Sequence, residues 1–245
     1  MDHPVRRTGD GGRGGESVTM TRVSPRWENR ETVAGFTSGG PNEVLITFAR
    51  RFREVSAQPL CLDIGCGAAR NALPLAELGF RVIATDLSAP MIDAARLRIL
   101  AAPAPAAVDL VRAPMQPLPF AGGVFDLVVA HGIWNLAGSA AEFRSAIAEA
   151  ARVARPGAGL FLFTFSRSTL TPDARPDAGE SFVYSSWNGE PQCFLDEAGL
   201  LDELARAGFV RDGSGPLTEY NAPRPGEIRM GGGPPVIYEG TFVRT

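Results

Sequence analysis

The sequence has few of the residues that build disulfides, zinc sites and membrane spans. It contains three cysteines in 245 residues, and their odd number and irregular spacing indicate a reducing compartment, which we expect to be the cytoplasm. Two histidines give little support to a zinc site, so we expect no metal. No apolar run reaches the roughly 18 residues of a membrane span, and the N-terminus lacks the apolar stretch of a secretory signal. We therefore expect no membrane partner.

The chain also lacks the charge excess of a nucleic-acid-binding protein. Its net charge is −3, and its basic residues are dispersed after about residue 55. Hydrophobic residues make up 44% of the chain, enough for the core of a single α/β domain. We expect a small-molecule substrate, no nucleic acid, and a monomer or homodimer.

Composition divides the chain into three parts. Residues 1–19 are glycine-rich with almost no large apolar side chains, which predicts a flexible tail, and Met20 is an alternative start. Residues 20–55 predict a helical segment, interrupted at 38–41, that either caps the site or packs on the sheet. Residues 56–245 form the main domain.

From residue 56 onward, predicted strands and helices alternate. Strands are expected near 60–64, 81–85, 107–112, 125–130, 159–165, 217–221 and 235–243, and helices near 68–78, 89–101, 139–153 and 195–208. The alternation predicts a parallel sheet with helices on both faces. The irregular stretch 166–194 is long for a loop in a compact domain, and such loops are usually functional.

The most informative segment is a glycine turn that follows the first predicted strand. Gly65 and Gly67 let a ligand approach the backbone closely, and Asp63 lies just before them at the end of the strand that faces ligands in such sheets. Asp86 ends the second strand, 23 residues after Asp63, where a carboxylate can bind two ribose hydroxyls. Together these residues predict a nucleoside site.

The same turn indicates which nucleoside derivative binds. Arg70 occupies the position of the third glycine in the dinucleotide fingerprint, so a dehydrogenase is disfavoured. Asp63 would repel a pyrophosphate and attract a cationic amino-acid group. S-adenosylmethionine has an ammonium group, a sulfonium and a ribose but no phosphate, and we expect it as the cofactor.

Five motifs in this order resemble those of the class I S-adenosylmethionine-dependent methyltransferases. They are Leu62-Asp63-Ile64-Gly65-Cys66-Gly67, Asp86-Leu87-Ser88, Leu118-Pro119-Phe120, Phe125-Asp126-Leu127-Val128-Val129 and Arg155-Pro156-Gly157-Ala158-Gly159. The resemblance covers about residues 56–245. It implies a Rossmann-like, seven-stranded mixed sheet with a C-terminal antiparallel hairpin, and transfer of a methyl group by in-line displacement.

The resemblance also implies which residues hold the cofactor. Asp63 would accept bonds from the ammonium group, Asp86 would bind the ribose diol, and Leu87 would lie against the adenine. The turn residues that would pass beneath the methionine part are Gly65, Cys66 and Gly67. Simpler structural roles remain open, because either aspartate can cap the following helix and Cys66 can fill the turn by its small size.

The adenine contact departs from the family pattern. Family members often have an acidic residue where this chain has Pro114, and proline offers neither a side-chain acceptor nor a backbone donor. The backbone N–H of Met115 and the side chain of Gln116 are then the expected adenine contacts.

Substrate contacts are expected after the fourth strand. His131 is the candidate general base or substrate contact, and a loop histidine that transfers no proton is the alternative. Trp134 and Asn135 could shape the pocket, although Trp134 fits a plain core position as well. Further candidates from the cap, the long loop and the C-terminal insertion are Trp27, Tyr184, Trp187, Glu190, Gln192, Cys193, Tyr220, Asn221 and Arg224. A solvated loop is the alternative for these.

Three functions remain open from the sequence. Residues 131–136 and 187–194 resemble small-molecule methyltransferases grouped with tellurite- and thiol-detoxifying enzymes, which favours a sulfur, selenium or tellurium nucleophile. An O-, N- or C-methyltransferase of quinone or natural-product biosynthesis is the first alternative. A protein that binds S-adenosylmethionine without catalysis is the second.

Overall fold

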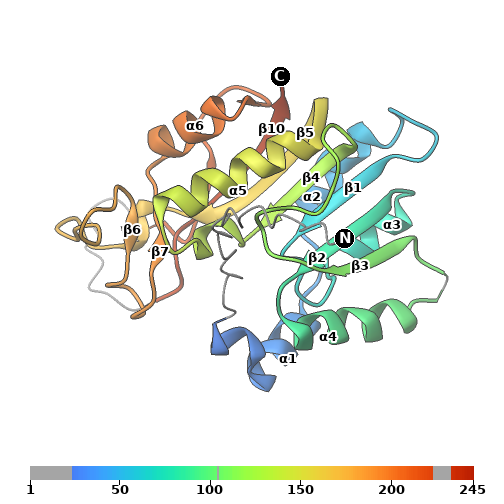
Figure 1. The fold of residues 1–245 in the computed structure, drawn as a ribbon, viewed down its shortest axis with the longest axis horizontal. Helices are drawn as coiled ribbons and strands as arrows, with labels where there is room; N and C mark the ends of the chain where they lie inside the picture. The colour runs from blue at the N-terminus through green and yellow to red at the C-terminus, as the bar shows by residue number, and fades with distance from the viewer. Residues whose placement is uncertain (1–23, 104, 223–232) are drawn as a thin grey trace, which may run out of the picture.

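The computed structural model describes residues 24–103, 105–222 and 233–245 (Figure 1). The expected tail 1–19 and the alternative start at Met20 lie outside the described residues. Within the described ranges no helix is both long enough and apolar enough to cross a membrane.

One mixed sheet runs through the centre of the domain in the order β3-β2-β1-β4-β5-β10-β8. Its strands are β1 (Leu60–Ile64), β2 (Arg81–Asp86), β3 (Val108–Arg112), β4 (Phe125–His131), β5 (Ala154–Phe165), β8 (Phe209–Arg211), β9 (Thr218–Tyr220) and β10 (Ile237–Arg244). The first five strands in the sheet order are parallel, and β10 is antiparallel to β5, β8 and β9. The Rossmann-like fold and the closing antiparallel hairpin are confirmed.

The sheet has eight strands because its outer position is divided between two short ones. β8 pairs with residues 242–244 of β10, and β9 pairs with residues 237–239 along the same edge. The chain between β8 and β9 contains Gly213 and Gly215, both with positive φ, and this turn interrupts the edge strand. The short strand β8 carries no alternating pattern, and the sequence did not predict it.

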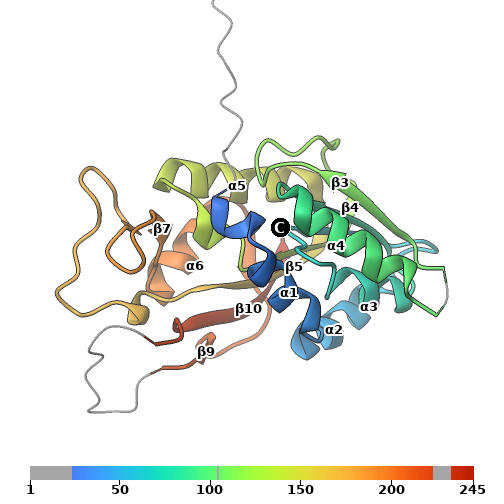
Figure 2. The ribbon, with the colours of Figure 1, turned by 90° about the horizontal axis from the view of Figure 1, so that it is seen from below.

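The helices cover the two faces of the sheet unequally (Figures 1 and 2). One face carries α2 (Glu43–Ala49), α3 (Ala72–Glu77) and α4 (Ala89–Leu100), and the other carries α5 (Ala140–Val153) and α6 (Glu197–Arg206). Phe80 and Phe161 anchor the first core, whereas Phe143 and Phe242 anchor the second. The predicted two-sided coverage is therefore confirmed.

Two element boundaries differ from the sequence prediction for backbone reasons. α3 begins at Ala72 rather than near residue 68, because Gly67 and Ala69 both have positive φ and hold the preceding residues in a turn. β5 begins at Ala154 rather than at Gly159, because Ala154 pairs with Phe125 ahead of a register shift in the β4–β5 ladder.

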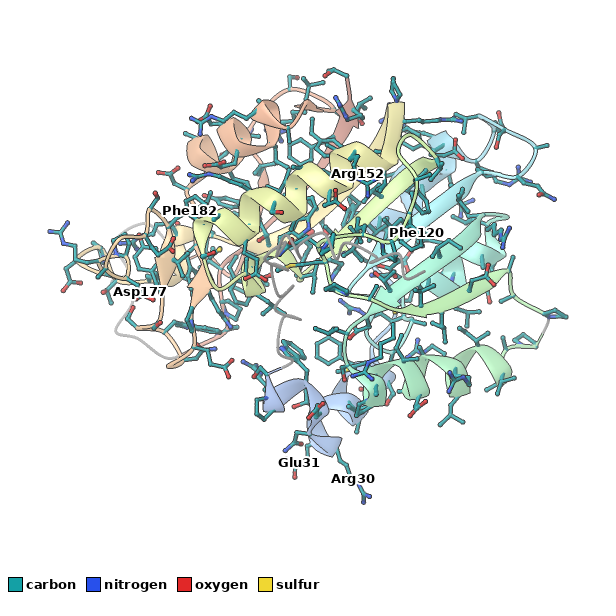
Figure 3. The ribbon with its side chains drawn as sticks, viewed as in Figure 1. Arg30, Glu31, Phe120, Arg152, Asp177 and Phe182 are labelled. Carbon is teal, nitrogen blue, oxygen red and sulfur yellow. The ribbon has the colours of Figure 1, made fainter. Side chains whose placement is uncertain are left out.

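The two halves of the N-terminal segment differ in how they pack on the domain. α2 and the following short helix η2 (Arg50–Phe52) insert Leu45, Phe48 and Phe52 into the core. The short helix η1 (Pro25–Glu28) and α1 (Arg30–Ser38) bury no residue completely, and Arg30 and Glu31 point away from the body of the domain (Figure 3). α2 and η2 therefore pack on the sheet, whereas η1 and α1 do not enter its core.

The long stretch 166–194 is an ordered insertion that docks on α5. It contains the short helix η4 (Arg167–Thr169) and an antiparallel pair, β6 (Val183–Tyr184) with β7 (Gln192–Cys193). Phe182 packs edge-on against Phe143 of α5, with ring centroids 5.2 Å apart, and lies beside α5 (Figure 3). This contact fixes the insertion near the carboxyl ends of the strands.

Gly159 supplies a test of how tightly the N-terminal segment is packed on the sheet. A Cβ at this position would lie 2.7 Å from the Phe52 ring and 3.1 Å from Leu127. We expect Gly159→Ala to lower the free energy of unfolding by about 1–3 kcal/mol through overpacking, measured by urea denaturation. The control is Gly35→Ala in α1, where nothing lies within 4 Å; it should be neutral or stabilising, and equal losses in both variants would contradict this packing.

Candidate functional site

A cavity of about 180 Å³ lies where the strand order reverses, beyond the carboxyl ends of β1, β2 and β4. Ligands bind at this place in open α/β sheets, because the loops after the two central strands diverge there. The floor comes from the glycine turn, one wall from the segments after β2, β3 and β4, and the roof from the N-terminal segment and residues 190–192.

The glycine turn is shaped by both conformation and space. Gly65 and Gly67 line the cavity with φ values of +68° and +52°, which residues with side chains rarely adopt. A Cβ on Gly65 would lie within 2.7 Å of Ile133. Cys66 between them is buried in the core on the α3 side, so it fills the turn as the simpler interpretation predicted.

Asp86 is fixed at the end of β2 by two backbone groups. Its Oδ2 accepts the N–H of Gly67 at 2.9 Å and its Oδ1 accepts the N–H of Ser88 at 2.8 Å. Ser88, not Asp86, caps α4 by accepting the N–H of Met91. Each carboxylate oxygen of Asp86 therefore keeps a lone pair for a ligand in the cavity.

Asp63 is a buried carboxylate that lacks a full set of partners. It is 1% exposed, and its Oδ2 has no hydrogen-bond partner among the described residues. Burial raises its pKa to about 7, while the Arg70 guanidinium lowers the pKa and the Asp86 carboxylate raises it. It does not cap α3, and it is not among the residues that line the cavity.

His131 ends β4 and lies between an aromatic face and a cation. Its ring stacks on Phe163 with centroids 4.2 Å apart, and Nη2 of Arg70 lies 3.2 Å from both ring nitrogens. Burial, followed by the positive charge of Arg70, lowers the pKa of His131 to about 3. The ring lines the cavity in its neutral form, so it suits a substrate contact better than a general base near neutral pH.

The expected adenine region is formed in part. Leu87, Pro114 and Met115 line the cavity, and Arg112 donates to the Leu87 carbonyl at 3.0 Å, which fixes that segment. Gln116 is not among the lining residues. Its Oε1 accepts the Ser145 hydroxyl of α5 at 3.2 Å, so its side chain points away from the cavity.

The roof joins two segments that are distant in the sequence. The Ser24 hydroxyl donates to Oε1 of Glu190 at 2.8 Å across the cavity opening. Trp27 lines the roof, packs edge-on against Phe36 and is tied to α4, since its carbonyl accepts the Ser88 hydroxyl at 2.9 Å. The sequence-based expectation that Trp27 lies at the site agrees with this position.

Four expected substrate residues lie away from the cavity. Trp134 is fully buried in the core, which corresponds to the alternative weighed for it, and Asn135 is buried beside it in the short helix η3 (Trp134–Leu136). Tyr184 packs on Phe194 and beneath the Arg167 guanidinium. Tyr220 donates to Oε1 of Glu239 at 2.7 Å, away from the cavity wall.

The three cysteines have structural positions. Cys61, Cys66 and Cys193 are buried thiols, and burial raises the pKa of each. Among the described residues, no three side chains of histidine, cysteine, aspartate or glutamate come together as a metal site would require.

The sequence did not single out several lining residues, because no local pattern marks them. Ser24 reaches the site only through the fold of the N-terminal segment, and Ile133 and Leu136 resemble ordinary core residues in sequence. Pro191 was not singled out either, whereas its neighbours Glu190 and Gln192 were candidates because they belong to the long irregular stretch.

The raised pKa of Asp63 predicts how stability depends on pH. An unfolded aspartate titrates near 3.8 and the folded one near 7, so ionisation costs the folded state progressively more as pH rises between these values. We expect the free energy of unfolding of ligand-free Asp63→Asn, relative to that of wild type, to increase by roughly 2.5 kcal/mol as the pH rises from 5 to 8. Urea denaturation at both pH values measures this gain, and a difference that does not change with pH would contradict the raised pKa.

The lowered pKa of His131 predicts a ring that stays neutral over the physiological range. The imidazole signals of His131 are assigned in two-dimensional NMR spectra as those that disappear in His131→Gln. In wild type, the ¹⁵N chemical shifts of these signals should remain constant from pH 8 to pH 5. An inflection near pH 6.5, the ordinary histidine pKa, would show that burial and Arg70 do not control the ring.

Comparison with known proteins agrees with this geometry. A methyltransferase domain model matches residues 62–162. A demethylmenaquinone methyltransferase of Renibacterium salmoninarum is 31% identical over 167 residues, covering 62% of this chain and 66% of that protein, just under two thirds. A malonyl-[acyl-carrier protein] O-methyltransferase of Salmonella typhimurium is 33% identical over 139 residues, covering 57% of this chain and 50% of that protein.

The fold has solved counterparts as well. The 1,6-didemethyltoxoflavin-N1-methyltransferase of Burkholderia thailandensis, crystallised with its substrate and S-adenosylhomocysteine, has a TM-score of 0.56 and 20% identity, covering 82% of this chain and 78% of that one. The motif order, the sheet topology and these matches lead to one conclusion: the chain has the fold of the class I S-adenosylmethionine-dependent methyltransferases, and its residues 62–162 match a methyltransferase domain.

Proposed function

We propose that this chain transfers a methyl group from S-adenosylmethionine to a small-molecule acceptor. The observation that carries the proposal is the arrangement at the cavity floor, where Asp86 is anchored to Gly67 beside the glycine turn. The enclosing roof favours a small acceptor, because a polymer could not pass through the Ser24–Glu190 contact.

The residues at the floor fit the cofactor. We assign the unpartnered Oδ2 of Asp63 to the cofactor's ammonium group, reached through water because Asp63 does not line the cavity. Gly65 and Gly67 line the cavity without side chains, and Asp86 has lone pairs free for the two ribose hydroxyls. Leu87 and Met115 offer an apolar surface for the adenine, with the Met115 N–H as its donor.

Methyl transfer from S-adenosylmethionine requires little catalytic chemistry from the protein, because the cofactor is already activated. The bound sulfonium supplies an activated methyl group, which bonds to the acceptor while the sulfur keeps the electron pair of the broken bond. The chain holds the acceptor in line at about 3 Å and keeps water out. With its pKa lowered to about 3, neutral His131 is suited to orient the acceptor rather than to take its proton, and the proton that the acceptor loses passes to solvent as the product leaves.

The comparisons favour a ring hydroxyl compound of the quinol type as acceptor. Several similar curated proteins, matched over about two thirds of their length or less, are named demethylmenaquinone methyltransferases. Apolar roof and wall residues, including Trp27 and Ile133, suit a ring. The soft sulfur, selenium or tellurium nucleophile expected from residues 131–136 and 187–194 is the competing proposal, and it fits the neutral His131.

Asp86→Ala tests the cofactor assignment. We expect calorimetric titration with S-adenosylmethionine to show binding that weakens about 100-fold or more in this variant, because two charge-assisted hydrogen bonds to the ribose are lost. The matched control is Asp109→Ala. It removes an exposed aspartate of β3 that forms an ion pair with Arg81 of β2. Equal affinity in wild type and Asp86→Ala would contradict the proposed site.

The same preparations then test transfer. Incubation with 2-naphthol, 2-naphthalenethiol and 2-naphthylamine, with methylated products measured by mass spectrometry, compares oxygen, sulfur and nitrogen on one ring. Methylation on oxygen or on a ring carbon supports the quinol-type acceptor, and methylation of the thiol alone supports the soft nucleophile. Tight cofactor binding without turnover on any acceptor would favour the non-catalytic alternative.

A further inference from the structure

Gln192 carries an unsatisfied amide at the roof of the cavity. It belongs to β7, lines the cavity and is only 3% exposed. Its backbone is held by pairing with Tyr184 of β6, but its side-chain Oε1 has no hydrogen-bond partner among the described residues. Buried amides are rarely left unpaired unless a ligand or water completes them.

The surroundings of Gln192 define what can complete it. The residues that line the cavity with it include the apolar Ile133, Leu136 and Pro191. The nearby carboxylate of Glu190 already accepts the Ser24 hydroxyl, and its charge disfavours an anionic ligand. A neutral group that both donates and accepts a hydrogen bond matches the amide whichever of its two ends faces the cavity.

We propose that the Gln192 amide binds a hydroxyl group on the methyl acceptor and so selects hydroxylated rings over apolar rings of the same shape. The inference rests on the proposed function, because it assigns the acceptor end of the same cavity. Gln192 is a specificity-determining residue in this arrangement, since an acceptor without the hydroxyl leaves the buried amide unpaired.

A buried water is the competing explanation for the unpaired amide. β7 packs against η3, where Nε1 of Trp134 and Oδ1 of Asn135 also lack partners among the described residues. A water could bridge several of these groups, and Gln192 would then be structural. The two explanations differ in whether affinity for a hydroxyl depends on Gln192.

The test compares two ring probes that differ in one group. Wild-type protein saturated with S-adenosylhomocysteine is titrated with 1-naphthol and with 1-methylnaphthalene, in which a methyl group replaces the hydroxyl. We expect 1-naphthol to bind about tenfold or more tightly. Gln192→Met, which keeps the side-chain length but removes the amide, should abolish this preference. Gln58→Met, at an exposed site before β1, should retain it.

Each outcome decides the proposal. An equal preference for 1-naphthol in wild type and Gln192→Met, or no preference in wild type, would overturn it and leave the water-bridged arrangement. If the methionine variant fails to fold, Gln192→Ala decides, because it also removes the amide and should abolish the preference, whereas the water-bridged arrangement predicts that the preference is retained. Failure of wild type to bind S-adenosylhomocysteine would instead count against the proposed function, so the two failures are distinguishable.

Discussion

The hydrogen bond from the Gly67 N–H to the Asp86 carboxylate is the contact on which the site depends. Together with the bond from the Cys66 N–H to the Thr85 carbonyl, it joins the turn after β1 to the end of β2. The left-handed conformations of Gly65 and Gly67 direct these N–H groups toward β2. The same contact therefore shapes the floor of the cavity and orients the acid that is proposed to bind the ribose.

The fold and the cavity floor could be predicted because their signals are local in the sequence. Strand, glycine turn, helix and acid follow one another between Leu60 and Asp86, so spacing alone brings Asp63, Gly65 and Asp86 together. The family motifs that contain Asp126 and Arg155 were also visible in the sequence, but the structural role of these two residues appears only in the fold. The buried carboxylate of Asp126 and the partly exposed guanidinium of Arg155 form an ion pair of 2.5 Å that joins β4 to the start of β5, away from the cavity.

The acceptor side could not be predicted because its properties arise from contacts across the chain. His131 was identifiable as a residue type in a useful place, yet its low pKa comes from burial and from Arg70, 61 residues earlier. The sequence placed Gln116 and Tyr220 at the site, whereas their oxygens are engaged by Ser145 and Glu239. The importance of Gln192 comes from its Oε1, which has no hydrogen-bond partner among the described residues. A sequence does not reveal which polar atoms the fold leaves unpaired.

The Ser24–Glu190 hydrogen bond has a kinetic consequence. It joins two segments of the cavity roof that are 166 residues apart, neither of which belongs to the central sheet. Entry and departure of ligands then require these two segments to separate while the sheet stays intact, which is a local opening rather than unfolding. If the site works as proposed, we expect the residence time of a ligand to follow the rate of that opening, so that one half-buried contact, rather than the stability of the core, limits how fast the site is emptied and refilled.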